Sequence, residues 1–332
     1  MASQKGHDCL LGSANPSRWV LMRFLSVLAA ATMLTVVPML AHAQAETWSE
    51  AQEVTVRTHV PGPTMWRVQK DGSEVIVIGI LPVFPKAQTW STRRIENALK
   101  SARVLIVPAS TNASVGDLFG LMSSKNLPQH EALKAVLPPP LYARYEGAAN
   151  RAGVSIKPFA HDKPVWAGAR LRKDILAKIG LTDQEPQATI VRLAHRAGVP
   201  VRASGHYRFA PLLKDINAMS LQASEACLGD ALDDIDFDFD RAPKAAAAWA
   251  VGDLKTVHAN YQGSALLKCL AGSDQAAAIL DHSIDDAAAA IAEALKTPGR
   301  SVAVFPLATL LRKNGVLDRL GVEGARISSP DY

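Results

Sequence analysis

The chain has 332 residues, of which 48% are hydrophobic and 20% are charged, and its formal net charge is +5. This composition is that of an ordinary globular protein with one or two domains, and it excludes a disordered chain. The small positive excess gives no reason to expect a nucleic-acid partner.

The first 43 residues have the pattern of a secretory signal peptide. Arg18 and Arg23 precede an apolar run over residues 24–40, and an Ala-x-Ala pattern that ends at Ala43 follows the run. A charged n-region, an apolar h-region and a small-residue cleavage site are the parts of such a signal. We therefore expect cleavage near Ala43 or Ala45, a periplasmic or secreted protein, and no membrane span after cleavage.

Two features of this segment leave alternatives open. Met22 begins an ordinary signal-peptide start by itself, so the protein starts at Met1 or at Met22. The apolar run is also nearly long enough to span a bilayer, which makes an uncleaved signal anchor the rival interpretation. Pro38 and the Ala-x-Ala pattern favour cleavage.

Cleavage would leave two cysteines, Cys227 and Cys269, in the mature chain. In an exported protein an even pair of cysteines favours one disulfide bond. The alternative is two separate buried thiols, because free cysteines pack as small hydrophobic side chains.

The predicted elements begin after a lead-in segment, residues 44–62. Residues 65–69 and 74–80 predict a β-hairpin around a glycine-containing turn. The second of these strands is continuously apolar, which predicts a central place in a sheet. Residues 91–102 then predict a helix, because small and apolar side chains recur at helical spacing.

The rest of the chain alternates between strands and helices. Strands are predicted at 104–107, 154–159, 199–203, 301–304 and 325–328. Helices are predicted on both sides of Pro138-Pro139-Pro140, at 164–180, 185–197 and 314–320, and through nearly all of 212–296. This order predicts an α/β (α+β) domain over residues 63–328, with a central mixed sheet, flanking helices and a mostly helical middle insertion.

Short motifs follow one another along this domain. They are Met65-Trp66-Arg67-Val68, Asp71-Gly72-Ser73, Ile95-x-x-Ala98-Leu99-x-x-Ala102, Lys163-Pro164-x-Trp166, Ala194-x-x-x-Gly198-Val199-Pro200-Val201, Trp249-x-x-Gly252-Asp253, Ile279-Leu280-Asp281, Ser301-Val302-Ala303-Val304 and Gly315-Val316-Leu317. Their order and spacing, rather than any single motif, resemble the TraB/GumN family of membrane-bound and exported proteins related to the Tiki metalloproteases.

The resemblance implies a divalent-metal site built from two G-x-x-H motifs and acidic partners, where the cation activates water for hydrolysis. This chain has Gly79-Ile80-Leu81-Pro82 at the first motif and Phe305-Pro306-Leu307-Ala308 at the second, so both histidines are replaced. The positions that correspond to the family's other polar residues are Pro108, Gln187, Gly205 and Ser283. The resemblance therefore implies a degenerate, catalytically inactive member without a metal or other cofactor.

Two polar clusters have part of a metal-binding pattern. His130-Glu131 begins like a zincin helix, but Lys134 stands where the second histidine would be, so we expect an exposed helix start. The acidic run at residues 233–240 lacks the glycine and the closing glutamate of an EF-hand loop. We expect it to form a solvated acidic turn between helices.

Three further candidates contain histidine. Ser204 and His206 follow a predicted strand, but the chain has no G-x-S-x-G nucleophile elbow. The adjacent pairs His161-Asp162 and Asp281-His282 are expected to be surface residues.

The remaining polar and aromatic clusters have structural interpretations. Arg93-Arg94 and Arg170-Arg172-Lys173 are expected on exposed helix faces. Trp66, Trp166 and Trp249 are expected to pack the scaffold.

The leading hypothesis is an exported protein that keeps the family's fold and binds a peptide or an envelope protein in the old cleft. The first alternative is a peptidase-like hydrolase with a relocated site, around Ser204 and His206 or near Asp236. The second is a structural envelope protein whose surface carries the interaction. The leading hypothesis predicts that the carboxyl ends of neighbouring strands meet beside Pro82 and Ala308.

Overall fold

The structure is a computed structural model that describes residues 62–328 except 113, 115, 117–119, 121–123 and 273. The predicted signal peptide, the start at Met22 and nearly all of the lead-in segment lie outside the described residues. None of the described helices is both long enough and apolar enough to cross a membrane.

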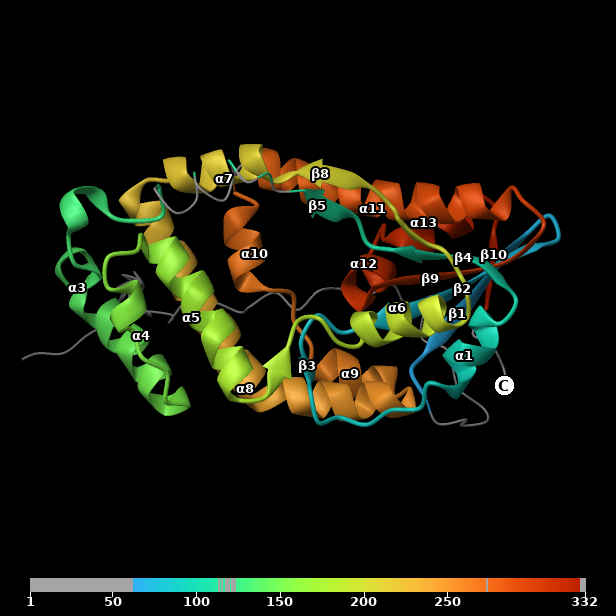
Figure 1. The fold of residues 1–332 in the computed structure, drawn as a ribbon, viewed down its shortest axis with the longest axis horizontal. Coiled ribbons are helices and arrows are strands. Elements are labelled where there is room, and N and C mark those ends of the chain that lie inside the picture. Colours follow the sequence, from blue (N-terminus) through green and yellow to red (C-terminus); the bar gives the residue numbers. More distant parts are fainter. Residues whose placement is uncertain are drawn as a thin grey trace, which may run out of the picture. The chain divides into compact units, whose positions relative to one another are not determined.

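A mixed sheet of six strands forms the centre of the fold (Figure 1). Its strands, in spatial order, are β10 (Arg326–Ser328), β1 (Met65–Lys70), β2 (Ser73–Ile80), β9 (Gly299–Pro306), β4 (Ala102–Val107) and β7 (Val201–Ala203). β1 runs antiparallel to β10 and β2, whereas β2, β9, β4 and β7 are parallel neighbours. The predicted mixed sheet is therefore confirmed.

The predicted hairpin is also confirmed. Lys70 of β1 pairs with Ser73 of β2, so the loop between them is the two-residue turn Asp71-Gly72. Both turn residues have positive φ angles, 49° and 79°, which is the conformation that two-residue hairpin loops require. β2 lies between β1 and β9, and its apolar residues are buried in the core between the sheet and the helices on its faces.

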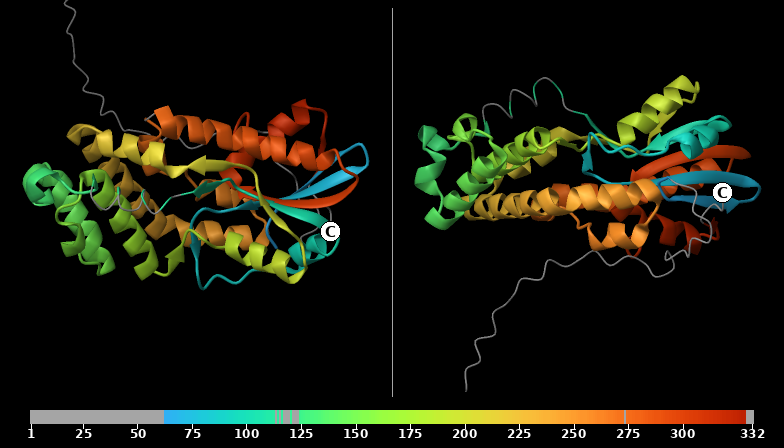
Figure 2. Two further views of the ribbon diagram at one scale, coloured as in Figure 1. Left: turned by 45° about the horizontal axis from the view of Figure 1, so that its top comes forward. Right: turned by 90° about the horizontal axis from the view of Figure 1, so that it is seen from below.

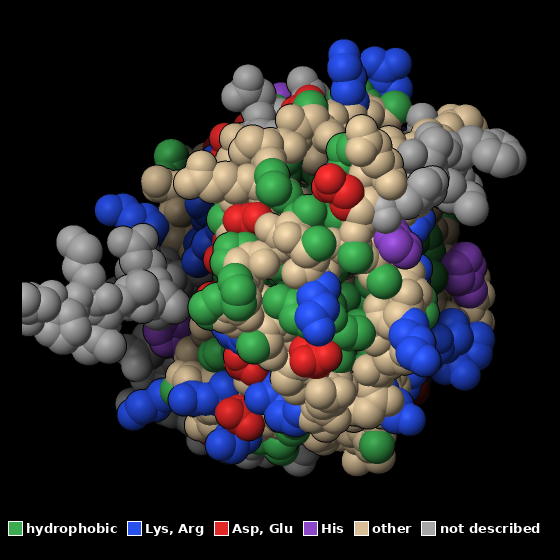
Figure 3. All heavy atoms as spheres, turned by 90° about the vertical axis from the view of Figure 1, so that its left-hand side faces the viewer, with side chains coloured by type: hydrophobic (Ala, Val, Ile, Leu, Met, Phe, Trp, Pro, Cys, Tyr) green, Lys and Arg blue, Asp and Glu red, His purple; other side chains and the backbone are tan. Residues whose placement is uncertain are grey.

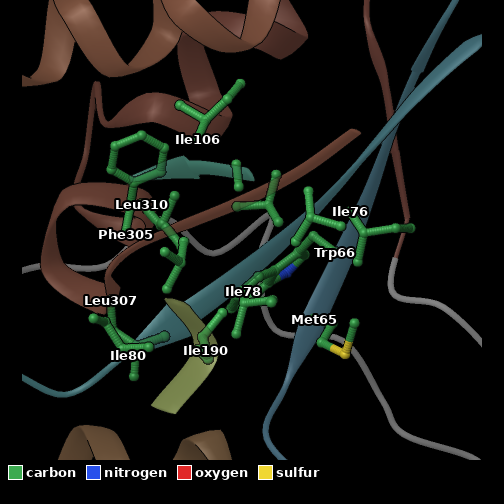
Figure 4. Close-up of a cluster of buried hydrophobic side chains, with 14 of the residues drawn as sticks. Met65, Trp66, Ile76, Ile78, Ile80, Ile106, Ile190, Phe305, Leu307 and Leu310 are labelled. Atoms are coloured by element: carbon green, nitrogen blue, oxygen red, sulfur yellow. The ribbon is translucent and has the colours of Figure 1, made fainter. Parts of the chain in front are cut away.

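Helices cover both faces of the sheet. α1 (Arg93–Leu99) and α6 (Gln187–Arg196) pack together against β4 and β7, and α11 (Asp274–Leu295), α12 (Leu307–Leu311) and α13 (Val316–Val322) pack against β2, β9 and β10. Figure 2 shows the strands between these two groups of helices. The largest hydrophobic core lies between the sheet and the helices on its faces, and Figure 4 shows Trp66, Ile78, Ile190 and Phe305 in it.

The middle of the chain is helical, as predicted. Its helices are α3 (Leu133–Val136), α4 (Pro139–Ala152), α5 (Pro164–Lys178), α7 (Phe209–Ala218), α8 (Leu221–Val251), α9 (Leu254–Ala259) and α10 (Ala265–Leu270). α5 and α8 approach closely at Gly168, where a Cβ atom would stand 3.0 Å from the Cβ of Ala231. Figure 3 shows hydrophobic side chains among scattered charged ones on the face at the α3 and α4 end.

The predicted disulfide bond joins Cys227 of α8 to Cys269 of α10. Two small strand pairs complete the described elements: β3 (Phe84–Pro85) with β6 (Leu181–Thr182), and β5 (Ser110–Asn112) with β8 (His206–Arg208).

One predicted strand was wrong, and several predicted element ends differ from the observed ones. Residues 154–159 form no strand but a loop and a 3-10 helix, η3 (Lys157–Phe159). The backbone N–H of Val154 donates a hydrogen bond to the carbonyl oxygen of Ala149 near the end of α4. Phe159 packs into a hydrophobic core formed by residues of α4, α5 and α8. The helix predicted to reach Ala102 ends at Leu99, because Ala102 is already the first residue of β4.

The acidic run at 233–240 lies inside α8, so the predicted turn between helices was wrong. Asp234 and Asp238 are buried one turn apart. Asp234 accepts hydrogen bonds from Ser264 Oγ and from two backbone amides at the start of α10, and Asp238 accepts one of 2.7 Å from Arg172. These partners compensate the buried carboxylates and let the run continue as helix.

The cluster at Arg170-Arg172-Lys173 and the pair His161-Asp162 also differ from expectation. Asp162 is only 1% exposed, because Lys125 and Arg170 bind its two carboxylate oxygens. Arg170 and Arg172 are therefore half-buried ion-pair partners, whereas Lys173 and His161 are exposed.

Candidate functional site

The carboxyl ends of four parallel strands meet at one edge of the sheet, here named the carboxyl edge. β2 and β9 pair up to Ile80 and Pro306. Pro82 and Ala308 each lie two residues further along the chain. β4 and β7 end at Val107 and Ala203, and Pro108 and Gly205 follow them. The structure thus brings all four of these sequence-predicted positions to the same edge.

Gln187 and Ser283 are placed toward this edge by the helices that carry them. Gln187 is the first residue of α6, whose far end connects directly to the start of β7. Because the connection is short, α6 runs back along β7 and its first turn lies toward the carboxyl edge. Ser283 lies on α11 one turn before Asp286, a residue that contacts Gly205.

Apolar side chains line the half of the carboxyl edge near Pro82 and Ala308. A Cβ atom on Gly79 would overlap the side chain of Leu307, which fills the space beside the end of β2. Figure 4 shows Ile80 and Leu307 next to each other at this end. Pro82 itself is exposed and Ala308 is half-buried, while Leu307 is fully buried.

Trp249, near the end of α8, packs against the apolar half of the carboxyl edge. Its indole Nε1 donates a 2.7 Å hydrogen bond to the carbonyl oxygen of Gly79, and the rings of Phe84 and Trp90 pack edge-on against it. The exposed fraction of Trp66 and of Trp249 is at most 1%, which confirms their predicted packing role. Trp166 is half-buried, and its Nε1 donates to Asn217.

The half of the edge after β4 and β7 is polar. Ser110 of β5 and His206 of β8 are direct register partners, and Ser110 Oγ lies 2.7 Å from His206 Nδ1. Tyr207 donates a 2.5 Å hydrogen bond to Asp286 Oδ2. Burial, together with the bond to Asp286 and its negative charge, raises the pKa of the Tyr207 hydroxyl, so it stays protonated as the donor.

Asp286 occupies the space beside Gly205. A Cβ atom on Gly205 would overlap Asp286 Oδ2 and would stand 3.5 Å from the Cβ of Ala109. Glycine at this position is therefore what lets α11 bring a carboxylate against the end of β7.

Sequence reasoning paired Ser204 with His206, but the structure does not. Ser204 Oγ is buried without a hydrogen-bond partner among the described residues, and His206 contacts Ser110 instead. Ser110, Tyr207 and Asp286 were missed. Ser110 follows β4 as His206 follows β7, so parallel pairing of the two strand ends was the signal that could have found it.

A sequence-family model of the TraB/PrgY/gumN family matches residues 64–329. The chain belongs to this family. The match begins just before β1 and ends just after β10, so it includes all the strands of the main sheet in this TraB/PrgY/gumN protein. Neither the comparison with curated proteins nor that with solved structures found a significant match.

The sequence-predicted positions Pro82, Pro108, Gly205 and Ala308 offer no side-chain donor to a divalent metal at the carboxyl edge. Proline, glycine and alanine side chains carry no ligand atom, and Asp286 is already bonded to Tyr207. Within the part of the chain that the structure describes, no three His, Cys, Asp or Glu side chains form a group that could hold a metal ion.

The other candidate residues of this TraB/PrgY/gumN protein have separate surroundings. His161 Nδ1 lies 3.1 Å from the carbonyl oxygen of Glu131, which is exposed between the short helix η2 (Pro128–His130) and α3. Asp281 and His282 are exposed on α11, as predicted.

Asp236 is bound by two arginines of α4, Arg144 and Arg151. The acidic run therefore stabilises contacts between helices.

Proposed function

We propose that this protein is an exported, catalytically inactive family member that binds an extended peptide segment of an envelope protein at the carboxyl edge. The observation that carries the proposal is the apolar filling of that edge beside Pro82, where Leu307 and Trp249 take the space next to Gly79. Pro82 is exposed and Ala308 is half-buried over this apolar filling, and burial of such uncharged side chains favours association with a partner. The signal-peptide pattern in the first 43 residues supports a periplasmic location.

Site-specific photocrosslinking tests the binding part. A photoreactive amino acid replaces Pro82, which is exposed at the carboxyl edge, and the matched control replaces Pro139, which is exposed at the start of α4. We expect a discrete crosslinked product in intact cells from position 82 and none from position 139. Equal products from both positions, or none from position 82, contradict the proposal.

A hydrolysis assay tests the catalytic part. The purified protein is incubated with a panel of unfolded proteins and peptides and with added Zn²⁺, Mn²⁺ or Co²⁺. We expect no cleavage that a chelator abolishes and metal restores. Such cleavage would show that the protein is a metal-dependent hydrolase.

The second candidate function is a serine hydrolase, which the 2.7 Å contact between Ser110 Oγ and His206 Nδ1 favours. A histidine in contact with a serine hydroxyl is the first requirement of an activated nucleophile. The contact lies at the same edge, and no hydrogen bond joins the pair to a carboxylate among the described residues.

Labelling with a fluorophosphonate distinguishes this candidate from the binding protein. If the protein is a hydrolase that uses Ser110, the reagent should label the unchanged protein and the Ser204→Ala variant but not the Ser110→Ala variant. We expect no labelling of either variant or of the unchanged protein.

A further inference from the structure

An open groove of about 930 Å³ lies at the opposite end of the sheet, where the parallel strands begin. The β1–β2 turn, the first residues of β9 and the connection from α13 to β10 form its walls. Figure 1 shows the β1–β2 hairpin beside the segment that leads into β9, and the two are joined by the pairing of Ser73 with Gly299. This volume falls in the range of small-molecule sites.

Arg300 is held in a fixed orientation at the floor of the groove. Its Nε donates to Glu74, and its Nη1 donates to Ser101 Oγ at 3.0 Å. Arg67 lies 3.3 Å from the other oxygen of Glu74. Of the two arginines only Arg300 lines the groove, and its ion pair with Glu74 has no net charge, so the excess positive charge of the groove comes from the rim.

The rim adds more positive charge than negative charge. Lys70 and Arg326 line the groove together with Asp71. The ammonium group of Lys70 donates a hydrogen bond to the backbone carbonyl oxygen of Glu323. A carbonyl oxygen has no formal charge, so this bond does not neutralise the ammonium group. Arg326 is exposed and pairs through its backbone with Gln69 of β1.

Two glycines keep the space above the backbone open. Gly72 and Gly324 have φ angles of 79° and 84°, and a Cβ atom on either would meet no heavy atom within 4 Å. The hairpin turn and the end of α13 already require these conformations. Their consequence is that a ligand can approach the peptide backbone here without a side chain in the way.

We propose that this groove binds a small oxyanionic molecule, through Arg300 and Arg326 and the charge of Lys70. A guanidinium group held in place, as that of Arg300 is by Glu74 and Ser101, binds the oxygens of carboxylates and phosphates, and the exposed Arg326 adds a second cationic donor. The site is independent of the binding proposed at the carboxyl edge, because it lies at the other ends of the same strands.

Thermal unfolding of the purified protein tests the proposal, with inorganic phosphate, pyrophosphate and citrate as probes at constant ionic strength set with chloride. Phosphate-bearing and carboxylate-bearing ligands are distinguished by which probe acts. The variant is Arg326→Gln. The matched control is Arg312→Gln, which changes an exposed arginine that lies outside the groove, at the end of α12.

We expect at least one probe to raise the unfolding temperature in a saturable manner. The apparent affinity for that probe falls about fivefold or more in Arg326→Gln, as the loss of one charge-assisted hydrogen bond would produce, and is unchanged in Arg312→Gln. The absence of a saturable response to all three probes, or an equal response of the Arg326→Gln variant and the unchanged protein, overturns the proposal.

Discussion

Trp249 and Gly79 are 170 positions apart in the chain, yet the indole Nε1 of Trp249 donates a 2.7 Å hydrogen bond to the carbonyl oxygen of Gly79. The bond fixes the last turns of α8 to the end of β2. It therefore joins the helical middle of the chain to the carboxyl edge.

Replacement of Trp249 by Phe should lower the free energy of unfolding by about 2–4 kcal/mol, because it leaves a buried carbonyl without its donor and opens a cavity. Denaturant unfolding measures the loss. Trp166→Phe is the matched control, because Trp166 is half-buried and water can replace its bond to Asn217. A loss no larger than in that control would show that the bond does not fix α8 to β2.

Gly205 should not tolerate even alanine. The added Cβ would overlap Asp286 Oδ2, so Gly205→Ala should cost about 1–3 kcal/mol of unfolding free energy. Gly229→Ala is the control, because Gly229 lies inside α8 with nothing within 4 Å of its added Cβ, and it should be neutral or stabilise by about 0.5–1 kcal/mol.

A double-mutant cycle tests the cause of that loss. If Asp286 is the obstacle, Gly205→Ala should cost clearly less in an Asp286→Ala background than in the unchanged protein. Equal costs in the two backgrounds would place the strain elsewhere.

The buried carboxylate of Asp238 should make stability rise as pH falls. Burial raises the pKa of Asp238 to about 6, and Arg172 lowers it only in part. The folded-state pKa is above the unfolded value of 3.8, so the folded protein binds more protons between these values. The contribution is complete below the unfolded pKa and is lost as pH rises through about 6, on the order of 3 kcal/mol in all.

Denaturant unfolding at pH 7.5 and pH 5.0 checks this sign. Asp238→Asn should lose the gain in stability that Asp238 supplies on acidification. Asp236→Asn is a control of opposite sign on the same helix: burial raises the pKa of Asp236, but Arg151 and Arg144 outweigh it and hold the pKa below its usual value. A pH dependence in Asp238→Asn equal to that of the unchanged protein would contradict the account.

The bond between Cys227 and Cys269 closes a loop of 42 residues, and its loss should cost on the order of 4 kcal/mol in the chain-entropy model. The double replacement Cys227→Ser and Cys269→Ser should lower the unfolding midpoint. Addition of a reductant should shift the unchanged protein to the same midpoint and leave the double variant unaffected. No shift upon reduction would show that the two thiols are not bonded in the purified protein.

The local chemistry of the sequence predicted much of the fold. Turn residues Asp71 and Gly72 identified the hairpin, and an unbroken apolar run identified β2 as central. The strand predicted at 154–159 was wrong because tertiary contacts outweigh the local preference. The N–H of Val154 bonds to the end of α4, and the apolar side chains of this segment pack between helices. Residues 233–240 are too acidic to suggest burial unless Arg172 and the start of α10 are known to face them.

The candidate site was predictable only in part. The family resemblance gave Pro82, Pro108, Gly205 and Ala308, and the structure places each of them just after the end of a parallel strand. Asp286 could not be found in this way, since its place beside Gly205 depends on how α11 lies across the sheet.

The most direct test of the central claim is the metal content of the protein purified without chelators, measured by inductively coupled plasma mass spectrometry. Pro82 and Ala308 replace the two histidines of the metal site that the family resemblance implies, so the protein should contain no divalent transition metal at a stoichiometric level. One equivalent of zinc, manganese or cobalt per chain, removed by a chelator together with a hydrolytic activity, would contradict the account.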